Sequence, residues 1–250
     1  MRSRIYVEKK MGTLLGTRAF LQRRVSARCQ TESTEMNSTN ETDVAIVGAG
    51  ISGLLAATQL QSQGQRVAVF DKARGVGGRM ATRRADDTVF DHGAQYFTAR
   101  DPGFRRLVED WSTHGLVRQW SDGFALADGG FKHDNEPRWF GVNGMTTVAR
   151  HLAENLDVRL HSRIAGVQHS GAGWALQFED GSAVNASALL LTPPVPQSLA
   201  LLEAGGVLLP SSAFAQLRSI EYAPCIALMV KMAGPIRIPP PGGLWTSGEP

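Results

Sequence analysis

A glycine-rich turn between two apolar strands constrains this sequence more than any other feature. The apolar run 44–47 predicts a buried parallel strand. Three glycines follow it at G-x-G-x-x-G spacing: Gly48, Gly50 and Gly53. A helix is expected over 54–63, and a second strand over 66–70 leads to Asp71. An acid about 20 residues past such glycines completes the fingerprint of a dinucleotide-binding βαβ unit.

Each glycine has a separate physical task in such a unit. Gly48 permits the tight turn out of the strand, Gly50 lets a pyrophosphate approach the backbone, and Gly53 lets the helix pack closely on the strand. The helix N-terminus offers unpaired N–H groups to the phosphates. Asp71 can accept hydrogen bonds from ribose hydroxyls. A glycine-rich turn without a ligand is the alternative, but it does not explain why strand, helix and acid follow in this order.

A second glycine-dense loop, 72–82, comes directly after this acid. Gly77 and Gly78 allow close approach to a ligand, and Arg74 and Arg79 can supply charge-assisted hydrogen bonds to a pyrophosphate. The alternative interpretation is a solvated basic loop. The two consecutive loops could therefore contact two sides of one pyrophosphate.

Two later stretches carry weaker signals. A short strand is expected within 89–98, running into a Gly-Ala turn whose backbone could lie against a flat ring. Asp91 and His92 are adjacent, so in a strand they point to opposite faces and make a poor catalytic pair. We interpret His92 as structural. Gly144 precedes a helix expected to end near Asn155, and this glycine could present N–H groups to a ligand.

The rest of the chain predicts a mixture of helices and strands. Asp101 and Pro102 are a good N-cap and N1 pair for a helix. Further expected elements are a hairpin over 124–131, strands at 157–161, 164–169, 174–178 and 188–192, a helix at 195–203 and a strand region at 222–232.

Length and charge exclude some classes of protein. The 250 residues suffice for one large domain or two small ones. The net charge of +3 comes from residues 1–40, which carry 8 Lys/Arg and 3 Asp/Glu. The remainder is slightly acidic, so we expect no nucleic-acid partner. Cys29 and Cys225 form neither a CxxC motif nor a metal-ligand spacing, and we expect no metal site. The uncharged segment 44–60 contains glycines and is barely long enough to span a membrane, so no span is expected.

Both ends of the sequence leave questions open. Residues 1–42 are rich in Arg, Ser and Thr and lack an apolar core of secretory-signal length. This N-terminal extension is a transit peptide, an overlong reading frame whose true start is Met36, or a disordered tail. We expect a cytoplasmic protein, or a plastid or other organelle protein if residues 1–35 are a transit peptide. Residues 239–250 do not look like the end of a finished domain.

Five motifs together resemble the amine-oxidase type of flavoprotein, and more closely the renalase-like FAD oxidoreductases. They are VAIVGAGISG (44–53), FDKARGVGGRMATRR (70–84), FDHGAQYFTARDPGF (90–104), RWFGVNGMT (138–146) and LLLTPP (189–194). The first motif is widely shared, whereas the second and third are much more specific. Members of the family carry a C-terminal segment with a Gly-Asp pair that this sequence lacks, so the chain is expected to be truncated.

The resemblance implies an α/β fold. It consists of a doubly wound, Rossmann-like FAD-binding domain, discontinuous over 43–100 and about 140–200, and a smaller α+β substrate domain with an antiparallel sheet, over about 101–139 and 201–250. Arg74, Gly78, Arg79 and Met80 are then expected around the phosphates and ribityl chain. The full set of expected cofactor-binding residues is Gly48, Gly50, Ile51, Ser52, Gly53, Asp71, Lys72, Arg74, Gly78, Arg79, Met80, Gln95, Tyr96, Phe97, Ile164, Thr192 and Pro193.

Within this set the resemblance implies separate roles. Gln95, Tyr96 and Phe97 are expected near the isoalloxazine ring, and Ile164 is expected to meet the adenine through its backbone. Thr192 and Pro193 are expected to close on the cofactor. No catalytic residue can be named, because flavin chemistry needs little from side chains beyond positioning.

Several functions remain open. The resemblance implies a flavoenzyme that accepts a hydride from a small reduced substrate, such as a dihydro-nicotinamide isomer of NAD(P)H, with oxygen as acceptor. An amine oxidase or a desaturase is the alternative within flavoenzymes. A truncated, non-catalytic dinucleotide-binding protein is the alternative from another class, and NAD(P) is the alternative dinucleotide.

Overall fold

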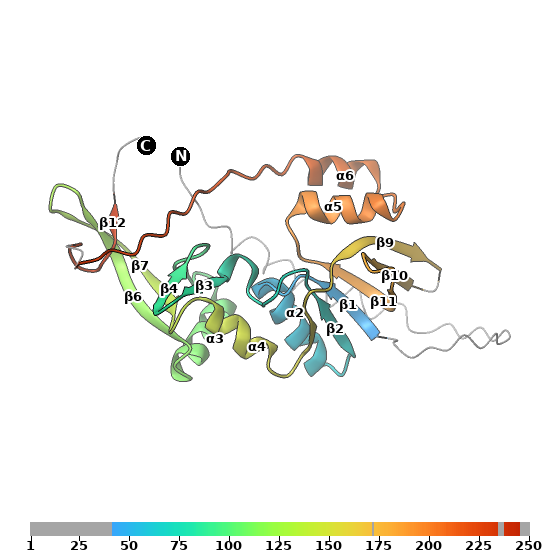
Figure 1. Ribbon diagram of the computed structural model, residues 1–250, viewed down its shortest axis with the longest axis horizontal. Coiled ribbons are helices and arrows are strands. Elements are labelled where there is room, and N and C mark those ends of the chain that lie inside the picture. Colours follow the sequence, from blue (N-terminus) through green and yellow to red (C-terminus); the bar gives the residue numbers. More distant parts are fainter. Residues whose placement is uncertain (1–41, 172, 235–237, 246–250) are drawn as a thin grey trace.

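The computed structural model describes residues 42–171, 173–234 and 238–245 (Figure 1). The expectations for the N-terminal extension fall on residues outside this description. In chain order the elements are β1 (Thr42–Val47), α2 (Ile51–Ser62), β2 (Val67–Phe70), the 3-10 turn η2 (Gly78–Met80), β3 (Thr82–Ala85), β4 (Thr88–Asp91), β5 (Phe97–Thr98), α3 (Pro102–Thr113), β6 (Val117–Leu126), β7 (Phe131–Gly141), α4 (Thr146–Ala153), β8 (Asp157–Arg159), β9 (Ile164–Ser170), β10 (Gly173–Phe178), β11 (Ala183–Leu191), α5 (Val195–Ala204), α6 (Ser211–Arg218) and β12 (Leu244–Trp245).

The larger sheet has six strands in the order β8-β2-β1-β11-β10-β9. The first four are parallel neighbours, and β10 and β9 continue the sheet antiparallel. One face of β1 and β2 packs with α2 and α4 around Ile46, Leu54 and Val69. The opposite face packs around Phe70 and Leu176, with α5 against it. This arrangement confirms the expected Rossmann-like α/β domain, and it explains why 44–47 is apolar on both faces.

The smaller sheet has the order β12-β6-β7-β5, and its centre is the long antiparallel hairpin β6–β7. The helix α3 lies beside it and contributes Phe104 and Trp111 to a core that also contains Phe97. Asp101 caps this helix by accepting a hydrogen bond from the backbone N–H of Phe104 at 2.9 Å, and Pro102 occupies the first turn. The predicted helix start and hairpin are therefore confirmed, and the sheet is antiparallel over β6, β7 and β5, whereas the short β12 joins it parallel to β6.

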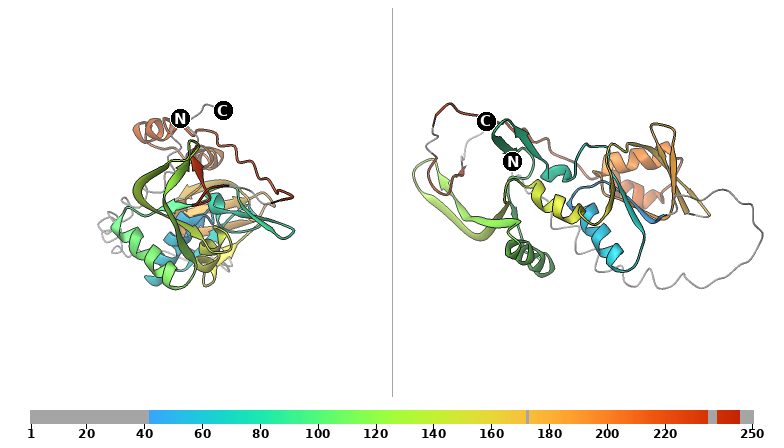
Figure 2. Two further views of the ribbon diagram at one scale, coloured as in Figure 1. Left: turned by 90° about the vertical axis from the view of Figure 1, so that its left-hand side faces the viewer. Right: turned by 60° about the horizontal axis from the view of Figure 1, so that its bottom comes forward.

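In space, the two sheets lie at opposite ends of the molecule, with α4 between them (Figure 2). A two-stranded hairpin, β3–β4, follows the second glycine-dense loop. Thr82 and Asp91 are paired across this hairpin. The hairpin therefore lies on the connection between β2 of the larger sheet and β5 of the smaller sheet.

The strand expected over 222–232 is not formed. In Figure 1 this segment runs as an extended trace from α6 back towards β12, and among the described residues no strand pairs with it. Ile226 is 95% exposed and Leu228 is 86% exposed. Apolar composition gives a segment the propensity for a strand, but a strand also requires a neighbouring ladder. Two polar contacts tie the segment to the rest of the fold. The hydroxyl of Tyr222 accepts a hydrogen bond from the N–H of Val195 at 2.9 Å, and Lys231 forms an ion pair with Asp87.

Candidate functional site

The turn between β1 and α2 contains three glycines with different surroundings. Gly48 has φ +104°, and a Cβ built there would lie 2.4 Å from the hydroxyl oxygen of Thr192. A Cβ at Gly53 would lie 2.0 Å from the carbonyl oxygen of Gly48. A Cβ at Gly50 would have no protein atom within 4 Å. Packing therefore requires Gly48 and Gly53, whereas Gly50 borders open space of the kind that an approaching pyrophosphate needs.

The second glycine-dense loop lies directly against this turn. The backbone N–H of Gly77 donates to the carbonyl oxygen of Ala49 at 2.8 Å. A Cβ at Gly78 would lie 3.3 Å from the Cα of Gly50, and Gly77 and Gly78 have positive φ, +113° and +53°. The second loop thus faces Gly50 of the first loop, and at this point both loops present backbone without side chains. The structure thus brings the two loops together, and their contact with one ligand stays a prediction.

Asp71 holds the two loops in place. One carboxylate oxygen accepts from the N–H of Ala49 at 2.7 Å, and the other accepts from the N–H of Ala73 at 2.8 Å. Each carboxylate oxygen has a further lone pair, so the side chain can still accept a hydrogen bond from a ribose hydroxyl. The anchoring of backbone is a task that the sequence fingerprint does not reveal.

Two further segments reach this edge of the larger sheet. The N–H of Ser162 donates to the carbonyl of Asp71 at 2.9 Å, which brings the start of β9 at Ile164 close to the acid. The hydroxyl of Thr192 donates to the carbonyl of Val47 at 2.8 Å. Together with the glycine loops, these segments lie at the carboxyl ends of the parallel strands, where ligands bind in open α/β sheets.

The Gly-Ala turn joins the same edge through η2. The N–H of Ala94 donates to the carbonyl of Arg79 at 2.8 Å, and a Cβ at Gly93 would lie 2.0 Å from that carbonyl oxygen. The turn is therefore pressed onto the second glycine-dense loop. Gln95, directly after it, is exposed.

The other expected binding residues differ in what they can offer. Phe97 is only 5% exposed and packs against Phe104, so its ring belongs to the core rather than to a ligand surface. Ile51 and Met80 also pack on that core. Lys72 donates to the side-chain carbonyl of Gln197 at 3.1 Å. Pro193 is half-buried, and exposed side chains come from Ser52, Arg74 and Arg79.

The N-terminus of α4 is not available to a ligand, contrary to the expectation for Gly144. The N–H of Met145 donates to Asp91 Oδ1 at 3.0 Å, and the N–H of Thr146 donates to the hydroxyl of Thr82 at 3.0 Å. A Cβ at Gly144 would meet the Thr82 side chain at 2.6 Å, which explains the glycine. These caps come from a distant hairpin, so a search for capping residues next to the helix misses them.

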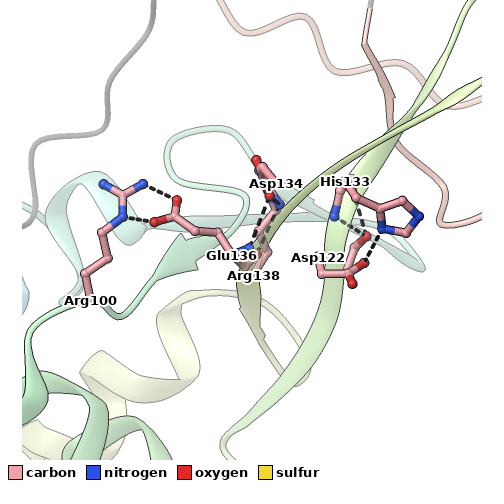
Figure 3. A network of polar contacts seen from close by, with 8 residues as sticks. Arg100, Asp122, His133, Asp134, Glu136 and Arg138 are labelled. Carbon is pink, nitrogen blue, oxygen red and sulfur yellow. Dashed lines mark hydrogen bonds and ion pairs between the residues drawn. The ribbon is translucent and has the colours of Figure 1, made fainter.

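A polar network lies on the β6–β7 hairpin of the smaller sheet (Figure 3). The Arg138 side chain is 6% exposed and forms a two-pronged ion pair with Asp134. Hydrogen bonds from the guanidinium hold the pKa of the Asp134 carboxyl below its ordinary value, and the same pair raises the pKa of Arg138. Arg100 pairs with Glu136 in the same network.

Aromatic rings surround this buried cation. The Arg138 guanidinium lies 4.5 Å from the ring centre of Phe124 and 5.6 Å from that of Tyr96. Tyr96 in turn lies 5.6 Å from Trp120. Tyr96 lies two residues after Ala94 of the Gly-Ala turn, so this aromatic cluster connects the smaller sheet to the edge where the glycine loops meet.

Two kinds of site are absent from the part of the chain that the structure describes. It contains no group of three or more His, Cys, Asp or Glu side chains placed to hold a metal ion. None of its helices combines the length and the apolar character that crossing a membrane requires.

Two protein-family models match the sequence. A model described as an NAD(P)-binding Rossmann-like domain matches residues 46–111. A model described as flavin containing amine oxidoreductase matches residues 119–249, just over half of the chain. The two matches divide the chain close to the start of the β6–β7 hairpin.

Curated relatives align with short stretches. Protoporphyrinogen oxidase 2, chloroplastic/mitochondrial, of Arabidopsis thaliana is 40% identical over 67 residues, which are 27% of this chain and 13% of the relative. The 4,4'-diapophytoene desaturase (4,4'-diaponeurosporene-forming) of Staphylococcus aureus (strain Newman) is 46% identical over 50 residues, 20% of this chain and 10% of the relative. The alignments thus span only about a tenth of each relative's length.

Solved structures of putrescine oxidase share the fold. A variant from a redesign of cofactor binding aligns with a TM-score of 0.57 and 18% identity, over 72% of this chain and 63% of the other. The wild type bound to putrescine aligns with a TM-score of 0.54 and 18% identity, over 71% and 63%. At this identity the likeness concerns the fold alone.

Proposed function

The chain belongs to the family of flavin-containing amine oxidoreductases, and from this premise we propose that it binds FAD and acts as an FAD-dependent oxidoreductase. The observation that carries the proposal is the meeting of two glycine loops at Gly50, with open space where a Cβ would stand. Asp71 and the start of β9 supply the ribose and adenine end of such a site. The residues present therefore fit the cofactor that the family carries.

The remaining contacts follow from the order of the segments. Gly78 and Arg79 lie beyond Gly50 on the second loop and would hold the pyrophosphate and ribityl chain, and Gly93 and Gln95 follow at the isoalloxazine end. Bound FAD would supply the two-electron oxidation by accepting a hydride from the substrate. The protein itself would orient the isoalloxazine ring. The aromatic cluster that begins at Tyr96 would keep water away from it.

We assign the larger sheet to the FAD-binding domain and the smaller sheet to the substrate domain. The first is discontinuous, because β1 and β2 precede the smaller sheet in the chain and β8 to β11 follow it. In this assignment β5, at Phe97–Thr98, belongs to the substrate side. The helices α5 and α6 accompany the FAD side, because α5 packs on β9 and α6 on α5.

For the substrate, we propose a dihydro-nicotinamide isomer of NAD(P)H, with oxygen as electron acceptor. The support is the resemblance of 70–84 and 90–104 to renalase-like oxidoreductases, because these motifs are more specific than the glycine fingerprint. The second candidate is an amine or a desaturation substrate. The names of the relatives favour it, since they include a putrescine oxidase and a desaturase.

Absorbance spectroscopy tests the cofactor, and a substrate panel tests the reaction. The purified chain, as isolated or reconstituted with FAD, is expected to show a protein-bound flavin band. Anaerobic addition of dihydro-nicotinamide isomers should bleach that band, and air should restore it with formation of hydrogen peroxide. Bleaching by putrescine or another amine instead would support the second candidate. A chain that carries no flavin and takes none up on reconstitution would support the non-catalytic alternative, and uptake of NAD(P) would identify NAD(P) as the bound dinucleotide.

The Gly50→Ala substitution is expected to weaken FAD binding without unfolding the protein. Its Cβ meets no protein atom and φ at this residue is −78°, so alanine fits the free chain. The same methyl group would occupy the space that the pyrophosphate requires, so we expect the dissociation constant for FAD to rise about tenfold or more. Titration by flavin fluorescence measures this change, and thermal unfolding measures stability.

Gly171→Ala is the matched control for this substitution. A Cβ at Gly171 also meets no protein atom within 4 Å, but the residue follows β9, away from the glycine loops. It should leave both FAD affinity and melting temperature nearly unchanged. Equal FAD affinity in Gly50→Ala and wild type would contradict the placement of the pyrophosphate.

A further inference from the structure

A closed set of hydrogen bonds joins β3, β4, η2 and α4. Asp91 Oδ1 accepts from the hydroxyl of Thr82 at 2.6 Å and from the N–H of Met145 at 3.0 Å. The N–H of Thr82 donates to the hydroxyl of Thr146 at 2.6 Å, and that hydroxyl donates to the carbonyl of Met80 at 3.2 Å. We refer to Thr82, Asp91 and Thr146 as the hairpin joint.

The hydroxyl groups of the hairpin joint have no spare donor. The Thr82 hydroxyl donates to Asp91 and accepts from the N–H of Thr146 at 3.0 Å. The Thr146 hydroxyl accepts from Thr82 and donates to Met80. Thr146 is 6% exposed, and loss of a partner in such a buried network leaves an unsatisfied polar group. Asp91 accepts from the Thr82 hydroxyl and from the N–H of Met145, so its removal leaves both donors without this partner and loosens Thr82, whose N–H and hydroxyl make the bonds to Thr146.

The hairpin joint fixes the position of the second glycine-dense loop. Met80, whose carbonyl the joint holds, is the last residue of η2, and η2 begins at Gly78. A Cβ added to Gly78 would lie 3.3 Å from the Cα of Gly50, so the two backbones are in close contact. Gly93, two residues after the end of β4, packs against the carbonyl of Arg79 in the middle of η2. A shift of the joint therefore moves the loop that faces Gly50.

We propose that Asp91 is a positioning residue for the cofactor site, acting through η2 without itself contacting the ligand. The carboxylate ties the N-terminus of α4 to the β3–β4 hairpin and so keeps the Gly77–Gly78 backbone at the distance from Gly50 that a bound pyrophosphate requires. The proposal rests on the proposed FAD site. Small displacements of a binding backbone have large effects, because every hydrogen bond to the ligand changes together.

Three variants test this role. Asp91→Ala removes the acceptor, and Asp91→Asn keeps one side-chain oxygen that can accept from Thr82 and Met145. Asp101→Ala removes an N-cap of the same kind from α3, where the carboxylate accepts from the N–H of Phe104. Both alanine variants remove a helix cap, but Asp91→Ala also leaves the Thr82 hydroxyl without its acceptor, so its stability loss should be the larger of the two, and the readouts below are compared at a temperature where both variants are folded.

Two readouts separate positioning from stability. In the absence of FAD, hydrogen exchange at residues 77–81 should be faster in Asp91→Ala than in wild type and unchanged in Asp101→Ala. In FAD titrations the dissociation constant should rise about tenfold or more in Asp91→Ala, return most of the way in Asp91→Asn, and stay within about twofold in Asp101→Ala.

The outcomes are distinguishable. Unchanged exchange at 77–81 or unchanged FAD affinity in Asp91→Ala overturns the positioning role, as does an equal loss of affinity in Asp101→Ala. If wild type binds no FAD but exchange responds as described, the cofactor assignment is wrong, and the structural role of Asp91 in holding the loop is supported.

Discussion

The Gly53→Ala substitution is expected to destabilise the protein by about 3 kcal/mol, although alanine is the better helix former. The added Cβ would lie 2.0 Å from the carbonyl oxygen of Gly48 and 3.2 Å from the Thr192 hydroxyl. Both contacts involve groups held by the sheet, so the turn itself must move. In a chain of this size such a loss corresponds to a fall in melting temperature of about 6–12 °C.

Gly103→Ala is the matched control for the packing argument. Gly103 is also in the first turn of a helix, α3, but its Cβ would meet only side-chain atoms, Asp101 Oδ1 at 3.0 Å and an Arg106 nitrogen at 4.0 Å. The Arg106 nitrogen can move away, and the capping oxygen of Asp101 must give by only a few tenths of an ångström, so we expect a loss of about 1 kcal/mol or less. A Gly53→Ala protein with the wild-type midpoint in chemical denaturation would contradict the close packing of helix on turn.

The second large effect is expected at the buried ion pair of the smaller sheet. Asp134→Ala leaves the Arg138 side chain, 6% exposed, without its counter-charge. Loss of one partner of a fully buried pair costs about 3–5 kcal/mol, and we expect about 1–3 kcal/mol because Asp134 itself is 38% exposed and screened by solvent. The double variant Asp134→Ala with Arg138→Met should recover most of this loss, since no buried charge remains.

The same pair gives a pH dependence with a definite sign. Hydrogen bonds from Arg138 lower the pKa of Asp134 in the folded protein. A lowered carboxyl pKa contributes stability that is fully present above the unfolded pKa of about 3.9 and is lost as the pH falls through the folded value. The stability difference between wild type and Asp134→Ala should therefore be largest at neutral pH and shrink in acid. A difference that stays constant from pH 7 to pH 3 would show that the charge pair contributes nothing.

Local sequence patterns predicted the first βαβ unit well. The run 44–47 forms β1, the three glycines form the turn into α2, and Asp71 directly follows β2, because each pattern is read within a few residues. The hairpin around 128–130 and the helix start at Asp101 are local in the same sense. The helix α2 begins at Ile51, three residues before the apolar pattern suggested, because the turn continues directly into it.

Long-range contacts were not predictable in the same way. The pairing of β1 with β11, the hairpin joint and the use of the α4 N–H groups by Asp91 and Thr82 all link residues far apart in sequence. Phe97 belongs to a motif with an expected cofactor role, yet its ring is in the core. The segment 222–232 has the apolar composition of a strand but no neighbouring strand among the described residues. Motifs record which residues are present, whereas pairing depends on what the rest of the chain brings beside them.

The contact of Thr192 with Gly48 has a consequence for synthesis of the protein. Its hydroxyl bonds to the carbonyls of Val47 and Gly48, 145 and 144 residues earlier in the chain. During translation the glycine turn emerges long before β11, and β1 then has an open edge that only β11 fills. The nascent turn therefore cannot reach its final form until residue 192 has left the ribosome, so the open edge of β1 persists while about 145 residues are added to the chain.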